Sequence, residues 1–248
     1  MKLVRTYSTP QVNDYIPLYA EIMRAPSVLI AGTPGSGKSV LLNGLIYNTL
    51  ADHAPGCKMF FIDPKRVELS RYSALPHCAG IAKDPRAACD LLAQVSDIME
   101  DRYKTMERAG QVKSTAPPVF VFADEIADIM LSDYAKPFTK LLQHLLQLGR
   151  AANIHIVYCT QIPARKILPP QIHAVTVEKI ALRCVSPIES RQVINKPGAE
   201  NLPRYGSAIW LNADGYQNIK NIPLISDEKI NARIAYWKRQ RGKIHITL

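Results

Sequence analysis

Apolar residues follow two alternating patterns along this chain. Buried strands are predicted by the continuous apolar runs at residues 28–31, 58–62, 119–123, 154–159 and 179–182. Helices are predicted, from apolar residues at helical spacing, over about residues 40–46, 85–109, 138–152 and 188–193. This alternation predicts one α/β domain over residues 27–248, with a mostly parallel sheet and helices on both faces. Residues 1–26 contain three prolines and predict an irregular lead-in with a short helix.

Turn-forming residues bound several of these elements. Asp84-Pro85 predicts the start of the long helix, because Asp caps a helix well and Pro suits its first position, and Gly110 predicts its end. Asp214-Gly215 predicts a β-hairpin between the two strand-like runs within residues 207–219. A last, basic helix is predicted over about residues 227–239.

A glycine-rich loop stands between the first predicted strand and the first predicted helix. It fits the spacing G-x-x-x-x-G-K-[ST], whose backbone N–H groups converge on a polyphosphate at the positive end of a helix. Lys38 would reach the β- and γ-phosphates and the Ser39 hydroxyl would bind Mg²⁺. A chance glycine-rich turn is the alternative, and the flanking strand and helix argue against it. The expected nucleotide-binding residues are Gly32, Thr33, Pro34, Gly35, Ser36, Gly37, Lys38, Ser39 and Val40.

Four chemically distinct residues stand at the ends of predicted strands: Gly32, Asp63, Asp124 and Gln161. The carboxyl ends of parallel strands lie at one edge of a sheet, so these residues should form one site. Asp124 is the expected Mg²⁺-orienting acid, and Glu125 suits a general base for the attacking water. Gln161 could bind both the γ-phosphate and that water. The alternatives are an exposed acidic pair that caps the next helix and, for Gln161, a polar strand-end cap.

Composition narrows the functional classes. The 248 residues, 47% hydrophobic, can bury one large core or at most two small ones. The net charge of +10 favours a polyanionic partner. The absence of an apolar run near 20 residues and of an apolar core in the first residues argues against a membrane span and a signal peptide, and favours the cytoplasm. The five separated cysteines suggest neither zinc nor a disulfide framework.

Several short motifs accompany the glycine-rich loop. They are I-D-P-K at 62–65, L-S at 69–70, P-H at 76–77, D-E-x-A-D at 124–128, R-A-A at 150–152 leading to I-H, T-Q at 160–161, S-R at 190–191 and G-A-E at 198–200. Over residues 27–211 they resemble the motor domain of the FtsK/SpoIIIE DNA translocases, within the HerA–FtsK superfamily. The resemblance implies a RecA-like P-loop ATPase that uses ATP and Mg²⁺, forms a hexameric ring, and pumps double-stranded DNA through its channel.

The resemblance also implies a role for Arg150, in the R-A-A motif. It would be an arginine finger that completes the active site of a neighbouring subunit by stabilising transition-state charge. The alternative is a helix C-terminal cation that complements the helix dipole. Arg183 and Arg191 are the other candidates for the finger.

Two departures from the family pattern affect the expected DNA contacts. The family often has a basic residue directly after T-Q and a lysine just after V-S, where this chain has Ile162 and Pro187. Arg165 and Lys166 are close enough to Ile162 to make the DNA contacts instead. The alternative is a solvated basic loop without a role in binding.

The regions that flank this motor in the chromosomal translocases have no counterpart in the sequence, which looks more like a stand-alone motor of a phage, plasmid or integrative element. Conjugation, genome packaging and chromosome segregation are all compatible with it, as is a membrane-bound partner. A protein-export ATPase of the type VII secretion kind is the second hypothesis, and a degenerate nucleotide-binding subunit the third. The intact Lys38, Ser39, Asp124 and Glu125 argue against the third, and the Arg150 and Gln161 context argues against a kinase or small GTPase.

Overall fold

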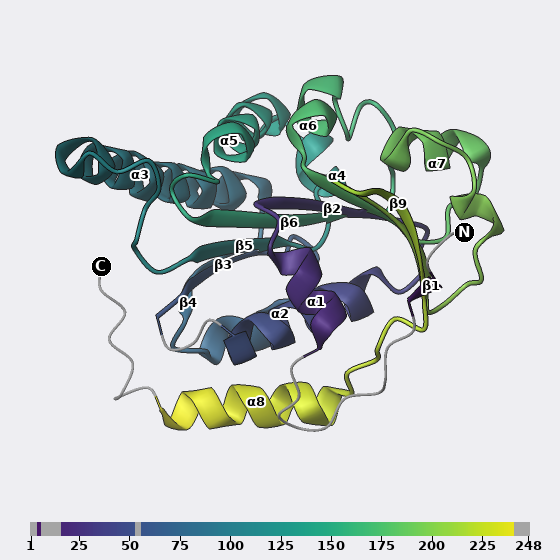
Figure 1. Ribbon diagram of the computed structural model, residues 1–248, viewed down its shortest axis with the longest axis horizontal. Helices are drawn as coiled ribbons and strands as arrows, with labels where there is room; N and C mark the ends of the chain where they lie inside the picture. The colour runs from purple at the N-terminus through teal and green to yellow at the C-terminus, as the bar shows by residue number, and fades with distance from the viewer. Residues whose placement is uncertain (1–3, 6–15, 53–55, 241–248) are drawn as a thin grey trace.

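A nine-stranded sheet forms the centre of the computed structural model, which describes residues 4–5, 16–52 and 56–240 (Figure 1). The strand order in this part of the chain is β1-β9-β8-β7-β2-β6-β5-β3-β4. The strands are β1 (Val4–Arg5), β2 (Ser27–Ala31), β3 (Lys58–Ile62), β4 (Cys78–Ala82), β5 (Val119–Ala123), β6 (Ile154–Thr160), β7 (Glu178–Ala181), β8 (Ser207–Asn212) and β9 (Gly215–Lys220). Neighbours from β7 to β4 are parallel, whereas β8 is antiparallel to both β7 and β9. The predicted mostly parallel sheet is confirmed.

Helices connect these strands. The α-helices of the described residues are α1 (Pro17–Met23), α2 (Lys38–Asp52), α3 (Pro85–Ala109), α4 (Ala127–Met130), α5 (Ala135–Leu148), α6 (Pro170–Val175), α7 (Pro187–Ile194) and α8 (Asp227–Arg239). Two short 3-10 helices, η1 (Ser70–Ala74) and η2 (Ala199–Asn201), complete them. Within the described ranges, no helix combines the length and the apolar character that a bilayer crossing requires.

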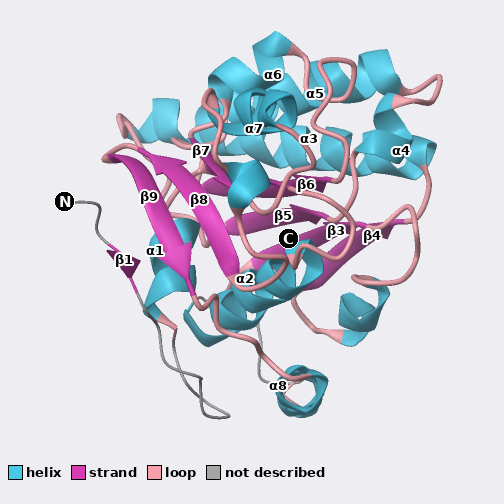
Figure 2. Ribbon diagram, turned by 90° about the vertical axis from the view of Figure 1, so that its right-hand side faces the viewer, coloured by secondary structure: helices cyan, strands magenta, loops and turns pink. Residues whose placement is uncertain are grey.

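The helices cover both faces of the sheet, as predicted. One buried cluster joins α3, α4, α5, α6 and α7 to one face, and a second joins α1, α2 and α8 to the other. Figure 2 shows the twisted sheet between these two groups, with α8 as the outermost element beyond α2. Strands such as β5 are therefore buried on both sides, which explains their continuous apolar sequences.

The boundaries of α3 agree with the prediction. The Asp84 carboxylate accepts a hydrogen bond from the Ala87 N–H at 2.8 Å, which caps the first turn. Gly110 ends the helix in the left-handed conformation, with φ of 62°. The predicted hairpin and the last helix also form, as β8–β9 and α8.

Two predicted features were wrong or missing. The helix expected to reach about residue 152 ends at Leu148, and Arg150 lies in the turn that follows it. The Arg102 guanidinium donates a hydrogen bond to the Ala152 carbonyl at 2.6 Å. This tertiary contact overrides the helix propensity of Ala151 and Ala152. Strand β4 was not predicted, because this edge strand is only partly buried and lacks a continuous apolar run.

The expected lead-in contributes to the core. Leu18, Tyr19 and Ile22 of α1 are fully buried against α2. A Cβ atom at Gly44 would lie 2.3 Å from the Tyr19 ring, so the glycine is what allows α1 to pack this closely. The Tyr19 hydroxyl donates to the Pro223 carbonyl and ties α1 to the segment before α8. The part of the lead-in before residue 16, apart from β1, lies outside the described residues.

Candidate nucleotide-binding site

The carboxyl edge of the sheet brings together the four strand-end residues named in the sequence. Ala31 of β2 pairs with Thr160 of β6, and Ala123 at the end of β5 pairs with Ile62 at the end of β3. The residues that follow these strand ends therefore share one edge. The Asp124 N–H donates to the Ile62 carbonyl at 3.1 Å, within this arrangement.

The glycine-rich loop, residues 32–39, is held in a conformation that its glycines make possible. Gly35 and Gly37 have φ of 71° and 101°, in the left-handed region that disfavours other residues. A Cβ atom at Gly32 would lie 2.7 Å from the Ser36 hydroxyl and 2.8 Å from the Leu182 Cβ. The Thr33 N–H donates to the Arg183 carbonyl at 2.8 Å, which fixes the loop to the segment after β7. The loop is thus built into the edge of the sheet.

The interior of this loop carries groups suited to an anion. The Lys38 side chain is buried, and its ammonium donates to the carbonyls of Gly32 and Thr33 at 2.7 and 3.1 Å. Burial lowers the pKa of Lys38, while the nearby Glu125 and Asp124 act in the opposite direction. The buried Ser36 hydroxyl has no hydrogen-bond partner among the described residues. A cation, an unpaired hydroxyl and the N-terminus of α2 fit the phosphates of a nucleotide.

Two buried acids face this loop. Asp124 is 7% exposed, and burial, followed by the charges of Glu68, Asp63 and Glu125, raises its pKa to about 6. A carboxyl destabilised in this way gains from a neighbouring cation, and one carboxylate with the Ser39 hydroxyl fits the sparse protein ligation that Mg²⁺ uses beside phosphates.

Glu125 is held more firmly. Its carboxylate accepts the Gln161 N–H at 3.0 Å and the Ala127 N–H at 3.1 Å, and it lies 3.7 Å from the Lys65 ammonium. Lys65 belongs to the I-D-P-K motif, but sequence reasoning gave it no role. The buried Asp63 of the same motif accepts the N–H groups of Leu69 and Ser70, so it organises the loop that presents Lys65.

Sequence comparison agrees with this geometry. Residues 8–116 match the sequence model of the FtsK/SpoIIIE family. The DNA translocase FtsK of Sporosarcina ureae is 32% identical over 249 residues, which cover 90% of this chain and 31% of that protein. Over these residues the chain is similar to FtsK/SpoIIIE proteins. It spans about a third of the length of the curated relatives that it matches.

Solved structures share the fold of this chain. The pCW3 conjugation coupling protein TcpA, with ATPγS, superposes with a TM-score of 0.74 at 22% identity, over 86% of this chain and 66% of that one. EssC (ATPases 2 and 3) of Geobacillus thermodenitrificans gives a TM-score of 0.76 at 16% identity, over 89% and 45%. At these identities the likeness concerns the fold.

Arg150 does not lie at the phosphate loop of its own chain. It is exposed, in the turn that enters β6 at its amino end, where Ile154 pairs with Val119 of β5. Seven residues of β6 separate that end from Gln161, which corresponds to about 23 Å along an extended strand. The structure thus puts Arg150 and the phosphate loop at opposite edges of the sheet.

Two other arginines do lie beside the phosphate loop. Arg183 anchors the loop through its backbone carbonyl, and its own side chain is exposed. The Arg204 guanidinium lies 3.4 Å from where a Cβ atom of Gly35 would be, and stacks at 5.3 Å over the Tyr205 ring. Sequence reasoning missed Arg204, because it belongs to no motif. Its only signal was its position shortly after G-A-E.

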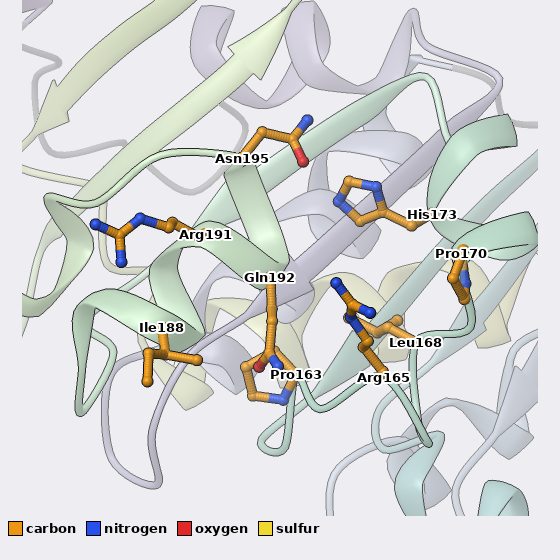
Figure 3. A pocket seen from close by; sticks show the side chains of 9 residues that line it. All are labelled: Pro163, Arg165, Leu168, Pro170, His173, Ile188, Arg191, Gln192 and Asn195. Carbon is orange, nitrogen blue, oxygen red and sulfur yellow. The ribbon is translucent and has the colours of Figure 1, made fainter.

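The two candidate DNA-binding residues differ in position. Arg165 lines a cavity of about 570 Å³ between the loop after β6 and α7, together with Arg191 and His173 (Figure 3). Figure 3 shows the Arg165 side chain pointing into the space between the loop and α7. Lys166 is exposed and does not line the cavity. We call this cavity the basic groove.

Proposed function

We propose that this chain is an ATP-hydrolysing motor that moves double-stranded DNA as a ring of identical subunits, with six the expected number. The observation that carries the proposal is the meeting of the phosphate loop with the buried Asp124–Glu125 pair at one sheet edge. Similarity to curated relatives that are named DNA translocases supports DNA as the track. A net charge of +10 also favours a polyanionic partner.

The phosphate loop would bind ATP together with Mg²⁺. ATP would supply the phosphoanhydride bond to be hydrolysed, and Mg²⁺ would neutralise charge on the phosphate oxygens. The Lys38 ammonium would release the carbonyls of Gly32 and Thr33 and donate hydrogen bonds to the β- and γ-phosphate oxygens instead. That exchange replaces neutral acceptors with charged ones and so strengthens the hydrogen bonds. Ser39 and Asp124 would hold the Mg²⁺.

Glu125 would be the general base, taking a proton from the attacking water at a carboxylate oxygen. Two N–H donors and Lys65 hold that carboxylate in a fixed orientation. Because the backbone N–H of Gln161 donates to Glu125, a shift of the Gln161 backbone with the state of the γ-phosphate would also move the base. Gln161 would therefore act as the nucleotide sensor.

Arg150 would act on the nucleotide of a neighbouring subunit. About 23 Å of strand separates its turn from the carboxyl edge of its own chain, so it cannot reach its own site. A ring in which the amino edge of one subunit meets the carboxyl edge of the next would remove this separation. Hydrolysis would then depend on assembly.

The basic groove would hold the DNA backbone. A motor that moves along any sequence needs contacts to phosphates, because they alone are uniform along the track. Arg165 and Arg191 line the groove from two different elements, the loop after β6 and α7, and each would contact a phosphate. Lys166 would add a weaker, solvent-exposed contact.

A polypeptide-export motor of the type VII secretion kind is the second candidate. The fold likeness to EssC and the apolar Pro163, Leu168 and Ile188 in the basic groove favour it, since a peptide needs apolar contacts as well as charged ones. We prefer DNA as the substrate of the motor because the curated relatives in sequence are named DNA translocases. A cytoplasmic location, a membrane-bound partner and a role in conjugation, packaging or segregation belong to the same proposal.

The test is the ATPase rate of purified protein alone and with duplex DNA, single-stranded DNA, RNA or an unfolded polypeptide. We expect the largest stimulation with duplex DNA, and no hydrolysis above background by Lys38→Ala protein. Stimulation by the polypeptide alone would replace the proposal with the second candidate. Hydrolysis by Lys38→Ala at the parent rate would overturn the assignment of the active site.

A further inference from the structure

The turn that carries Arg150, residues 149–153, is fixed at both ends by a single helix. At one end the Tyr103 hydroxyl donates to the Leu148 carbonyl at 2.8 Å. At the other end the Arg102 guanidinium donates to the carbonyls of Ala152 and Asn153 at 2.6 and 3.2 Å. Arg102 and Tyr103 are adjacent in α3, so one turn of that helix holds both ends of the Arg150 turn.

Arg102 also reaches a second connection. Its other terminal nitrogen donates to the Pro117 carbonyl at 2.6 Å, just before β5. The Ser114 N–H donates to the Ala151 carbonyl and the Asn153 side chain to the Ala116 carbonyl, at 2.8 and 2.9 Å. The connections that enter β5 and β6 are thus joined to each other around one guanidinium.

The chemistry of this contact requires arginine. Three carbonyls from two segments need several donors in a fixed plane, which a guanidinium has and an ammonium does not. Burial lowers the pKa of Arg102, which indicates that the charge is partly desolvated at this position. Such a group gains from every carbonyl dipole that faces it, so the contact is specific as well as strong.

Arg150 stands in the middle of this fixed turn, and its side chain is exposed. We propose that Arg102 and Tyr103 are positioning residues that hold Arg150 in the orientation needed to reach the nucleotide of the neighbouring subunit. This inference rests on the proposed function, in which Arg150 is the finger. A displacement of about 1 Å at a catalytic group can cost on the order of 100-fold in rate, so a finger on an irregular turn needs such support.

The test compares Arg102→Ala with a matched control on the same helix, Lys104→Ala, whose side chain is exposed and pairs with Asp101. We expect Arg102→Ala to reduce kcat about 10- to 100-fold and to leave the affinity for a fluorescent ATP analogue unchanged. Lys104→Ala should match the parent in both. The kcat of Arg102→Lys should be reduced nearly as much as that of Arg102→Ala. The kcat of Tyr103→Phe should fall about two- to threefold.

Two further measurements separate positioning from general damage. Mixing Arg102→Ala with Lys38→Ala protein should restore part of the activity, because some interfaces then join an intact phosphate loop to a well-held Arg150. In an Arg150→Ala background, Arg102→Ala should cause no additional loss, because both changes remove the same contribution.

Each failure has its own meaning. An unchanged kcat in Arg102→Ala, or an additional loss in the Arg150→Ala background, would overturn the positioning role. Full activity of Arg150→Ala itself would instead refute the proposed function. If Arg102→Ala protein does not fold, Arg102→Lys and Tyr103→Phe decide the question, and parent-like kcat in both would overturn the inference.

Discussion

The two edges of the sheet hold their charged side chains in different ways. At the carboxyl edge, Lys38 at the start of α2 and Asp124 and Glu125 after β5 are almost fully buried. At the amino edge, Arg150 is exposed and is fixed indirectly, through carbonyls of its turn that α3 holds. The first arrangement suits a site that must keep out bulk solvent while it holds a single attacking water. The second suits a residue whose target lies on another molecule.

The largest expected effect concerns the amino edge. Arg150→Ala should reduce ATPase activity about 10³- to 10⁵-fold, the usual contribution of an arginine finger, without weakening nucleotide binding. Mixing with Lys38→Ala protein should restore part of the rate, because each variant supplies what the other lacks. The ATPase rate of the mixture is measured by steady-state kinetics. Arg183→Ala and Arg191→Ala, the other candidates for the finger, are measured in the same way for comparison. If rings shown to contain both variants recover no activity, Arg150 does not act on a neighbouring subunit, and the proposed difference between the two edges is wrong.

The next effect concerns the carboxyl edge. Glu125→Gln should slow hydrolysis about 10²- to 10⁴-fold while nucleotide still binds, because the amide cannot accept the proton from water. Asp128→Asn, in the same D-E-x-A-D motif but exposed, is the matched control and should behave as the parent. Single-turnover hydrolysis checks both, and parent-like rates in Glu125→Gln would exclude it as the base.

A smaller effect is expected at the basic groove. Arg165→Ala should weaken duplex DNA binding about tenfold and lower the slope of log affinity against log salt by about one. Lys166→Ala should have less effect, because its side chain lies outside the groove. DNA-free ATPase activity should stay unchanged in both. Titrations at several salt concentrations compare the pair, and equal losses would indicate an unspecific basic loop.

The smallest effect tests whether the carboxyl edge extends beyond its motifs. Arg204→Ala should weaken ATP binding about three- to fivefold, since its exposed guanidinium lies beside the phosphate loop but is screened by solvent. Arg24→Ala, also exposed, follows α1 rather than flanking the loop, and should leave the affinity unchanged. Calorimetric titration with ATP compares the two variants with the parent. Identical affinities would show that Arg204 is not part of the nucleotide-binding site.

Sequence patterns predicted the carboxyl edge well because its determinants are local. Gly35 and Gly37 are needed by the backbone of their own loop, and Asp124 and Glu125 follow the most apolar strand directly. The amino edge depends on contacts between residues about 50 positions apart, such as Arg102 with Ala152. Such contacts leave no periodic signal, which is why the end of α5 was predicted four residues too late.

Helix α3 connects the two edges as a rod. It begins beside the carboxyl end of β4 and runs back past the amino ends of β5 and β6, as Figure 1 shows. Its 25 residues correspond to roughly 37 Å, with Arg102 about 27 Å from Asp84. A tilt of about 5° at its start would shift Arg102 by roughly 2 Å, by the same geometry. If Arg150 is the finger proposed above, the stiffness of this one helix would set how much of a movement at one nucleotide reaches the site of the next subunit.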